Sequence, residues 1–366
     1  MSINFRFAII SDPHVAIPQT IRGAANRFHL VEVSIPALEL VFDHLERQNI
    51  DFLLIPGDLT QDGEPENHQW LQQRLASLPF PAYVIPGNHD VPTLLSTENS
   101  IGFDDFSAYY CQFGYQNSQK HYYTCEVIPG VQLIALNSNQ FNSQGKQLGC
   151  LDEEQIAWLE QLLPQVKDKL ILVMIHHNVI EHLPGQSHHE LGKRYMLDNA
   201  SVLLKMLREA EAKLIFSGHL HVQDIAYQEG IYEITTGSLV SYPHPYRIIE
   251  VQANGLKNLE FKIESHRVNT LSGWENLAEF SRNWLGDRSY PFMMKLLTSH
   301  PLNLEIEEAE KLVPQLRYFW ADMADGDAIF DFVDFPPSVR HYFQYFSAIN
   351  EDGSPNLIDN HARLII

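Results

Sequence analysis

Five short apolar stretches in this 366-residue chain each end in acidic, amide or histidine side chains. Each stretch has the composition of a buried strand, and the endings read DPH, GD, GNHD, HH and GHLH. In open α/β sheets, ligand sites form beyond the carboxyl ends of the strands, so buried strands would bring these side chains to one edge. The endings occupy residues 12–14, 57–58, 87–90, 176–177 and 218–221.

Strand patterns alternate with helical patterns over the first two thirds of the chain. FRFAII at 5–10 predicts a strand, and apolar residues recur at helical spacing over 31–49. Beyond residue 221, four stretches have the pattern of antiparallel strands. This order predicts the α/β class, with two packed sheets and helices outside them. Further strands are expected within 51–58, 82–90, 121–128, 131–137, 169–178 and 213–221, and helices within 65–78, 152–165 (capped by Asp152) and 197–209.

The character of the chain changes near residue 270. Residues 275–349 have mainly helical patterns and are rich in aromatic side chains, such as Trp284 and Trp320. Because aromatic stripes more often form a core than a ligand site, we expect this region to pack on the sandwich or to form an oligomer contact. The expected organisation is therefore an α/β domain over 1–268, which carries the five strand endings, and a helical, aromatic-rich extension over 269–366.

The formal net charge of −21 disfavours a general attraction for nucleic acid or for an anionic membrane. A phosphate-bearing substrate would need bound cations, which reverse the local field. The three cysteines show no pairing pattern for a disulfide framework or a zinc knot. With no signal-peptide pattern and no apolar run of membrane-spanning length, we expect a cytoplasmic protein with neither nucleic acid nor membrane as a partner.

Each strand ending also has an ordinary explanation when it is taken alone. Asp58 would be a turn residue, Asn88 would form a local turn with its own backbone, and His176 and His177 would be buried hydrogen-bonding groups. The joint occurrence of all five endings, each at the end of a predicted strand, favours a metal site instead.

The order D-x-H, GD, GNHD, H and GHxH resembles the calcineurin-like metallophosphoesterase superfamily. Within it, the chain is similar to class III cyclic-nucleotide phosphodiesterases and bacterial glycerophosphodiesterases, through GDLTQDG at 57–63, PGNHD at 86–90 and LDEEQIAWLEQLL at 151–163. The resemblance covers residues 5–265 and implies a four-layer α/β/β/α sandwich of two mixed sheets flanked by helices.

The resemblance also implies two divalent or transition metal ions, which would be Mn, Fe or Zn. Carboxylate and imidazole ligands without thiolates suit such ions, and Asp58 would bridge them. Strand alternation lets only one of His176 and His177 face the site, and the resemblance selects His176. The first ion would take Asp12, His14, Asp58 and His221, and the second Asp58, Asn88, His176 and His219.

The mechanism implied by the resemblance is attack on phosphorus by a hydroxide held between the two ions. His89 would donate a hydrogen bond or a proton to the phosphoryl group or to the leaving oxygen. Asp90 would either orient His89 or cap a helix, and the sequence leaves both roles open. The histidines of 181–192, residues 236–247, Arg22 and Arg27 are candidates for substrate contacts.

We therefore expect a phosphodiesterase that acts on a small phosphoester, such as a cyclic nucleotide or a glycerophosphodiester. A phosphomonoesterase or nucleotide pyrophosphatase at the same site is an alternative within the same class. A binding or scaffold protein with this fold is an alternative of another class, although all the matched positions hold competent ligands. The C-terminal region is a candidate for homo-oligomer contacts.

Overall fold

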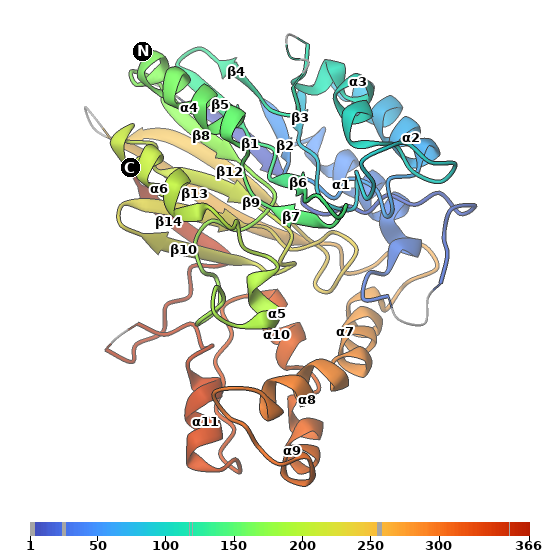
Figure 1. Cartoon of the computed structure of the whole chain (residues 1–366), viewed down its shortest axis with the longest axis vertical. Helices are drawn as coiled ribbons and strands as arrows, with labels where there is room; N and C mark the ends of the chain where they lie inside the picture. Colours follow the sequence, from blue (N-terminus) through green and yellow to red (C-terminus); the bar gives the residue numbers. More distant parts are fainter. Residues whose placement is uncertain (1–3, 24–26, 117, 119, 255–257, 351) are drawn as a thin grey trace.

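The computed structural model describes residues 4–23, 27–116, 118, 120–254, 258–350 and 352–366. In this part of the chain, two six-stranded sheets stack on one another and helices cover their outer faces (Figure 1). The fold is therefore the predicted α/β/β/α sandwich of two mixed sheets, with a C-terminal helical region below it.

The first sheet has the strand order β14-β13-β12-β1-β2-β3. β1, β2 and β3 are parallel, because the crossovers between them carry the helices α1 and α2, whereas β12, β13 and β14 pair antiparallel. These elements are β1 (Phe5–Ile9), α1 (Ser34–Leu45), β2 (Phe52–Ile55), α2 (Pro65–Ala76), β3 (Ala82–Val84), β12 (Pro245–Asn254), β13 (Asn258–Arg267) and β14 (His361–Ile365).

The second sheet has the order β10-β11-β9-β8-β5-β4, and α4 and α6 pack on its outer face. Asp152 caps α4 as predicted, because its carboxylate accepts a 2.7 Å hydrogen bond from the Gln155 amide. The elements are β4 (Tyr123–Ile128), β5 (Val131–Ala135), α4 (Glu153–Val166), β8 (Leu170–Met174), α6 (Ala200–Glu209), β9 (Leu214–Ser217), β10 (Asp224–Gln228) and β11 (Ile231–Thr235).

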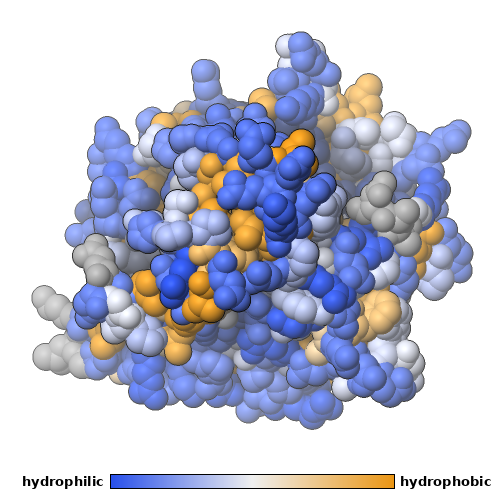
Figure 2. Space-filling model, turned by 90° about the horizontal axis from the view of Figure 1, so that it is seen from below, coloured by the Kyte–Doolittle hydropathy of each residue, from blue (hydrophilic) through white to orange (hydrophobic). Residues whose placement is uncertain are grey.

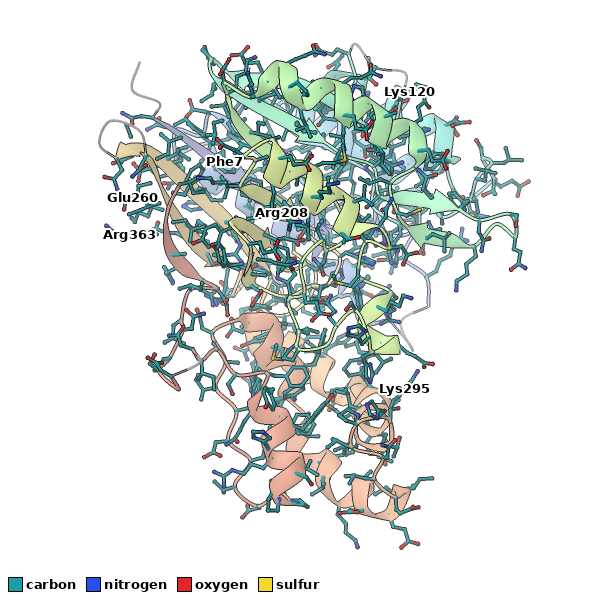
Figure 3. All side chains as sticks on the ribbon, turned by 60° about the vertical axis from the view of Figure 1, so that its left-hand side comes forward. Phe7, Lys120, Arg208, Glu260, Lys295 and Arg363 are labelled. Carbon is teal, nitrogen blue, oxygen red and sulfur yellow. The ribbon has the colours of Figure 1, made fainter. Side chains whose placement is uncertain are left out.

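The main apolar core lies between the two sheets. Phe7 of β1 stacks on Phe52 of β2 with ring centroids 4.9 Å apart, and it meets Phe216 of β9 edge to face at 5.5 Å. All three rings are fully buried, and each such ring stabilises the fold by about 2–3 kcal/mol. Figure 3 shows Phe7 inside the sandwich, whereas Lys120 and Arg208 lie at its surface.

The C-terminal helices have a core of their own, built largely from phenylalanine. Phe319 packs against Phe330 and Phe343 with ring centroids 4.6 and 5.0 Å away. Seen from below, the surface of the molecule also has apolar side chains gathered between hydrophilic ones (Figure 2). Within the C-terminal helical region, Ile306 and Val333 are exposed. The helices are α7 (Leu277–Arg288), α8 (Tyr290–Thr298), α9 (Ile306–Leu312), α10 (Phe319–Asp325) and α11 (Pro337–Gln344).

The sequence analysis does not predict β14, which returns from the helices and joins the edge of the first sheet. Ala362 and Leu364 of β14 are buried, while the alternate residues are exposed. Glu260 of β13 and Arg363 of β14 form an ion pair of 3.3 Å on the outer side (Figure 3). The helical region is thus an excursion between two paired strands.

Four other short elements were also outside the expectations from sequence, because they are too brief to show a period. They are α3 (Phe106–Tyr109), β6 (Asn139–Phe141), β7 (Gln147–Gly149) and α5 (Glu190–Lys193). Among the described residues, no helix combines the length and the apolar character needed to cross a bilayer.

Candidate metal centre

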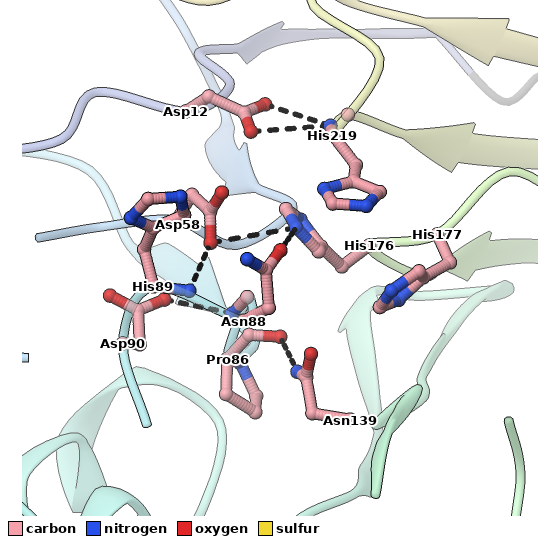
Figure 4. Close-up of polar contacts among 12 residues, drawn as sticks. Asp12, Asp58, Pro86, Asn88, His89, Asp90, Asn139, His176, His177 and His219 are labelled. Carbon is pink, nitrogen blue, oxygen red and sulfur yellow. Dashed lines mark hydrogen bonds and ion pairs between the residues drawn. The ribbon is translucent and has the colours of Figure 1, made fainter. Parts of the chain in front are cut away.

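The loops after β1, β2, β3, β8 and β9 meet at one edge of the sandwich (Figure 4). The first three loops come from one sheet and the last two from the other. The strand ends that the sequence analysis selected therefore converge, and their side chains form two neighbouring clusters.

The first cluster joins the loops after β1, β2 and β9. Its potential ligand atoms all lie within 4.8 Å of one another. The Nε2 of His14 is 3.7 Å from Oδ2 of Asp58 and 3.5 Å from Nε2 of His221, which is itself 3.2 Å from Oδ1 of Asp12. The cluster consists of Asp12, His14, Asp58 and His221.

The second cluster joins the loops after β2, β3, β8 and β9. The Nε2 of His176 lies 3.5 Å from Oδ1 of Asp58 and 3.1 Å from Oδ1 of Asn88. The Nδ1 of His176 lies 2.8 Å from the carbonyl oxygen of Pro56, so Nδ1 carries a proton and donates a hydrogen bond to that oxygen, while Nε2 faces the cluster. Asp58, His176 and His219 also bring their potential ligand atoms within 4.8 Å.

Asp58 belongs to both clusters and dominates their electrostatics. Burial alone would raise the pKa of Asp58, but His176 and His89 outweigh burial and hold this pKa well below its ordinary value. Burial likewise opposes the charged form of His176, yet Asp58 raises the pKa of His176 to about 9. A deprotonated carboxylate thus sits between two groups of imidazoles, as a bridging ligand requires.

The backbone at the predicted metal-binding residues is unusual. Five of them have φ between 39° and 66°, a region that residues other than glycine rarely adopt and that the surrounding structure must stabilise. Gly87 also packs so closely on Asp58 that a Cβ at residue 87 would overlap the Asp58 carboxylate. The five residues with positive φ are Asp12, His14, Asp58, His219 and His221.

His177, the neighbour of His176, lies outside both clusters. Its Nδ1 is 2.8 Å from the Ser138 hydroxyl. Burial, followed by the effect of His176, lowers the pKa of His177 to about 3, so this imidazole is neutral. The structure therefore places His176, the histidine that the resemblance selected, in the second cluster and His177 outside it.

His89 lies beside the first cluster, with its ring centroid 4.7 Å from that of His14. Its Nδ1 is 2.6 Å from the carbonyl oxygen of Gln61 and 3.8 Å from the Asp62 carboxylate. Although burial opposes the charge, Asp58 and Asp62 raise the pKa of His89 to about 9. The imidazole therefore favours its protonated form at the edge of the cluster.

Asp90 has a different environment from the two that the sequence analysis considered. Its buried carboxylate accepts hydrogen bonds of 2.8–3.0 Å from the backbone amides of Leu59, Thr60 and Gly87. Residues 88–90 form a turn, so Asp90 caps no helix, and the acceptor at the His89 ring is the Gln61 carbonyl. Asp90 instead ties the loop after β2 to the loop after β3.

His29 is the residue at this site that the sequence analysis missed. Its ring centroid is 4.0 Å from that of His14 and 4.8 Å from that of His221, and these three histidines form a further group whose ligand atoms lie within 4.8 Å. Its Nδ1 is 3.3 Å from Oε1 of Gln61. No strand ending or motif marks His29, so only the folded loop reveals it.

Three of the candidates for substrate contacts, Arg22, Arg27 and His182, bind other side chains of the protein and do not line the cavity above the clusters. Arg22 donates to Asn99, and Arg27 is paired with Glu32. His182 is buried against Asp224, with 2.6 Å between Nδ1 and the carboxylate. Within the stretch 236–247, Ser241 and Tyr242 do line the cavity above the clusters, as expected.

That cavity has a volume of about 810 Å³. Its lining includes Asp58, Asn88 and His89 from the loops of the sandwich, and Phe292 and Trp320 from the C-terminal helices. Four of the predicted metal-binding residues thus line a space large enough for a small-molecule ligand, namely Asp58, Asn88, His219 and His221.

The donor set fits divalent first-row cations, because it offers carboxylate, amide and imidazole ligands without thiolates. Two ring nitrogens, on His14 and His221, face each other across 3.5 Å. At this separation, one ring can donate a hydrogen bond to the other, or both lone pairs can bind one cation. The described residues therefore suit two cations that share Asp58.

Comparison with known proteins agrees with this geometry. A model of the family described as calcineurin-like phosphoesterase matches residues 5–223. A probable glycerophosphodiester phosphodiesterase GpdQ of Arcobacter nitrofigilis is 30% identical over 176 residues, which cover 47% of this chain and 56% of that protein. A probable cyclic nucleotide phosphodiesterase of Synechococcus sp. is 29% identical over 223 residues, which cover 60% of this chain and 74% of that protein.

Against the first of these relatives, the chain spans only a little more than half of the relative's length. Among solved structures, a dimetal phosphatase from Danio rerio matches 72% of this chain and 96% of its own, with a TM-score of 0.53 and 15% identity, which shows a shared fold. The family match covers more than half of the chain and includes the loops that carry both clusters. This chain therefore belongs to the calcineurin-like phosphoesterase family.

Proposed function

We propose that the chain is a metal-dependent phosphodiesterase that hydrolyses a small phosphodiester at the two clusters. The observation that carries this proposal is the shared, buried Asp58 carboxylate between two sets of imidazoles, at the base of an open cavity. The names of the relatives support a diester substrate, because they include a glycerophosphodiester phosphodiesterase and a cyclic nucleotide phosphodiesterase.

The proposed ligand sets are those expected from the sequence. Bound divalent cations would supply positive charge for the phosphate and would lower the pKa of a water molecule toward about 7, which makes it a nucleophile. Asn88 contributes a neutral oxygen, so the site keeps a net positive charge for an anionic substrate. The sets are Asp12, His14, Asp58 and His221 for one cation, and Asp58, Asn88, His176 and His219 for the other.

His89 is the proposed catalytic residue among the side chains that do not bind metal. Its Nδ1 donates to the Gln61 carbonyl, which fixes the orientation of the ring, and the ring lines the cavity. The other ring nitrogen then donates a hydrogen bond to a phosphoryl oxygen, or a proton to the leaving oxygen. Asp90 acts as a positioning residue, since it holds the loops that carry Asp58 and His89.

A substrate panel tests the proposal. Protein reconstituted with Mn²⁺ should be assayed with bis(p-nitrophenyl) phosphate, p-nitrophenyl phosphate, cyclic AMP and a glycerophosphodiester. We expect turnover of at least one natural diester, a preference for bis(p-nitrophenyl) phosphate over the monoester, and loss of turnover in Asp58→Ala and Asn88→Ala. The exposed Asp43→Asn, on α1, is the control that should keep full turnover.

The alternatives predict other outcomes of the same panel. Preference for p-nitrophenyl phosphate would establish a phosphomonoesterase, and equal turnover in the Asp58 and Asn88 variants would remove the assigned roles. A scaffold protein would turn over none of the four substrates under any metal loading.

A further inference from the structure

One part of the cavity wall comes from residues beyond the family match at 5–223. It includes Tyr242, Leu285, Phe292 and Trp320, which are brought there by the loop before β12 and by α7, α8 and α10. These residues lie outside the region that the family model matches, so membership of the family does not fix the identity of this wall, which suits a role in substrate choice.

The wall is joined directly to the loop that carries two predicted metal-binding histidines. Leu220, between His219 and His221, is buried in one apolar cluster with Ala324, and Tyr195 and Trp320 pack on the same cluster. The ring centroid of Tyr195 is 4.9 Å from that of His219. The aromatic wall therefore has a position fixed relative to the clusters, as a substrate-binding surface requires.

The α5 segment and its flanks hold the helices against this site. Lys295 of α8 forms a 3.0 Å ion pair with Glu190 of α5, and Lys295 lies next to α5 in Figure 3. The Nε2 of His219 lies 3.3 Å from the carbonyl oxygen of Arg194, just after α5. The segment from Glu190 to Arg194 thus contacts both the second cluster, through His219, and the C-terminal helices, through Lys295.

The rings of the wall can bind a planar group. The centroids of Phe292 and Trp320 are 5.3 Å apart, with the ring planes tilted by 60°. At this separation the two rings touch, so a planar group cannot enter between them; it would stack on the face of one ring and meet the other at an angle. Both rings are half-buried and line the cavity, and aromatic faces of this kind stack with nucleobases of any type.

The size and charge of the cavity also indicate its occupant. A volume of about 810 Å³ exceeds what a glycerol or ethanolamine ester of phosphate would fill. The exposed residues that line it include three basic ones, Lys146, Lys193 and Arg194, and two acidic ones, Glu190 and Asp198, although the chain carries a net charge of −21. Because Glu190 is also paired with Lys295, the local balance of charge is positive, and this favours an anionic ligand.

We propose that Tyr242, Phe292 and Trp320 form a base-binding subsite, so that the substrate is a nucleotide whose base stacks on the C-terminal wall. This inference rests on the proposed phosphodiesterase function and adds the substrate class to it. The scissile phosphodiester lies over the two clusters while the base lies against α8 and α10, and the C-terminal helices act as the specificity element of the enzyme.

Two esters that differ only in the base test the subsite. Mn²⁺-loaded full-length protein should be assayed with thymidine 5′-(p-nitrophenyl phosphate) and with the base-free 2-deoxyribose 5-(p-nitrophenyl phosphate), which release the same product. We expect the thymidine ester to have a kcat/KM roughly tenfold higher, in line with stacking of one base. Phe292→Leu and Trp320→Leu should remove most of this advantage and leave the base-free ester within about twofold of wild type.

Tyr290→Ala is the matched control, because Tyr290 is an exposed aromatic residue of the same helix as Phe292 and does not line the cavity. It should leave both rates unchanged. The leucine variants keep apolar volume, and circular dichroism should verify that they fold.

Equal rates for the two esters in the wild-type protein would overturn the subsite and leave the phosphodiesterase intact. Faster cleavage of octyl p-nitrophenyl phosphate than of the thymidine ester would also overturn it, in favour of an alkyl group. If no ester is cleaved, the proposed function fails, and calorimetry with thymidine 5′-monophosphate and 2-deoxyribose 5-phosphate still decides the subsite. Tighter binding of the nucleotide, lost in Trp320→Leu, would support it, and equal binding would refute it.

Discussion

The C-terminal helices and the loops that carry the two clusters both form walls of one cavity, but they are stabilised in different ways. The loops are held by buried polar contacts: Asp90 accepts three backbone hydrogen bonds, and His176 is fixed by the carbonyl of Pro56. The helices are held by aromatic packing around Phe319 and Phe343. Polar contacts fix atoms within tenths of an ångström, as catalysis needs, whereas apolar packing tolerates changes in the shape of a binding wall.

Removal of the shared Asp58 carboxylate should affect metal binding at the loops and leave the C-terminal helices unchanged. In Asp58→Asn, both clusters lose the carboxylate that they share, and the second cluster keeps no other carboxylate, so we expect kcat/KM for bis(p-nitrophenyl) phosphate to fall by a factor of about 1,000 or more. Elemental analysis should find less bound Mn²⁺, while the fluorescence of the C-terminal tryptophans stays unchanged. Asp43→Asn, on the far side of the first sheet, should behave as wild type. Retention of the full metal content by Asp58→Asn would contradict the proposed ligand sets.

A pair of glycine substitutions compares the tolerance of the two walls. A Cβ at Gly87 would overlap the Asp58 carboxylate and backbone, so Gly87→Ala should destabilise the protein by about 1–3 kcal/mol and displace Asp58. Gly286 lies in α7, where a Cβ would meet Tyr318 at 3.1 Å, and the higher helix propensity of alanine, about 1 kcal/mol, offsets this tight contact.

Urea unfolding and Mn²⁺ titration measure both effects. We expect reduced stability and weaker Mn²⁺ binding for Gly87→Ala, and changes within about 1 kcal/mol and no change in Mn²⁺ affinity for Gly286→Ala. If Gly286→Ala destabilised the protein more than Gly87→Ala, the helices, and not the loops, would be the less tolerant wall.

The same difference explains how much the sequence could predict. Asp58, Asn88 and His219 follow apolar strands directly, so topology alone brings them to one sheet edge. His29 lies in a loop tied back by the Leu30 amide to the Val240 carbonyl, a contact between distant segments that no local pattern records. The contact of Trp320 with the Leu220 cluster is equally non-local.

Secondary structure shows the same limit at β14. Its alternating buried residues, Ala362 and Leu364, give a five-residue strand signal, which is too short to outweigh the helical character of the preceding eighty residues. The sequence analysis placed Asp90 at the site from its position after His89. Its hydrogen-bond partners are backbone amides of two loops, and only the folded turn at 88–90 reveals them.

A buried ion cluster behind the metal centre should make stability depend on pH. His182 lies 2.6 Å from Asp224 and 3.5 Å from Glu233, and Glu233 also accepts from the Val179 amide beside the histidine pair. Burial opposes the charge, but Glu233 and Asp224 raise the pKa of His182 to about 10 from 6.5. The stabilisation is therefore complete below pH 6.5 and is lost as the pH rises through about 10.

Urea unfolding of His182→Gln and of wild type at pH 6 and pH 10.5 measures this dependence. The variant should be less stable than wild type by about 1–3 kcal/mol at pH 6, and the difference should shrink at pH 10.5. His189→Gln, in the same loop but at the start of α5, is the control and should show no such change between the two pH values. A difference that grew with pH would contradict the charged form of His182.

The smallest expected effect concerns the strand that returns the C-terminal helices to the sandwich. Arg363 and Glu260 form an ion pair whose side chains are 72% and 30% exposed, so Arg363→Ala should change the unfolding free energy by less than about 1 kcal/mol. Leu364, beside it, is buried between the strand and the core, and Leu364→Ala should cost about 2 kcal/mol or more. Thermal unfolding of both variants compares them directly. If Arg363→Ala were the more damaging, charge rather than apolar burial would anchor β14, and the helices would be tied to the sheet by the kind of contact found in the metal-centre loops.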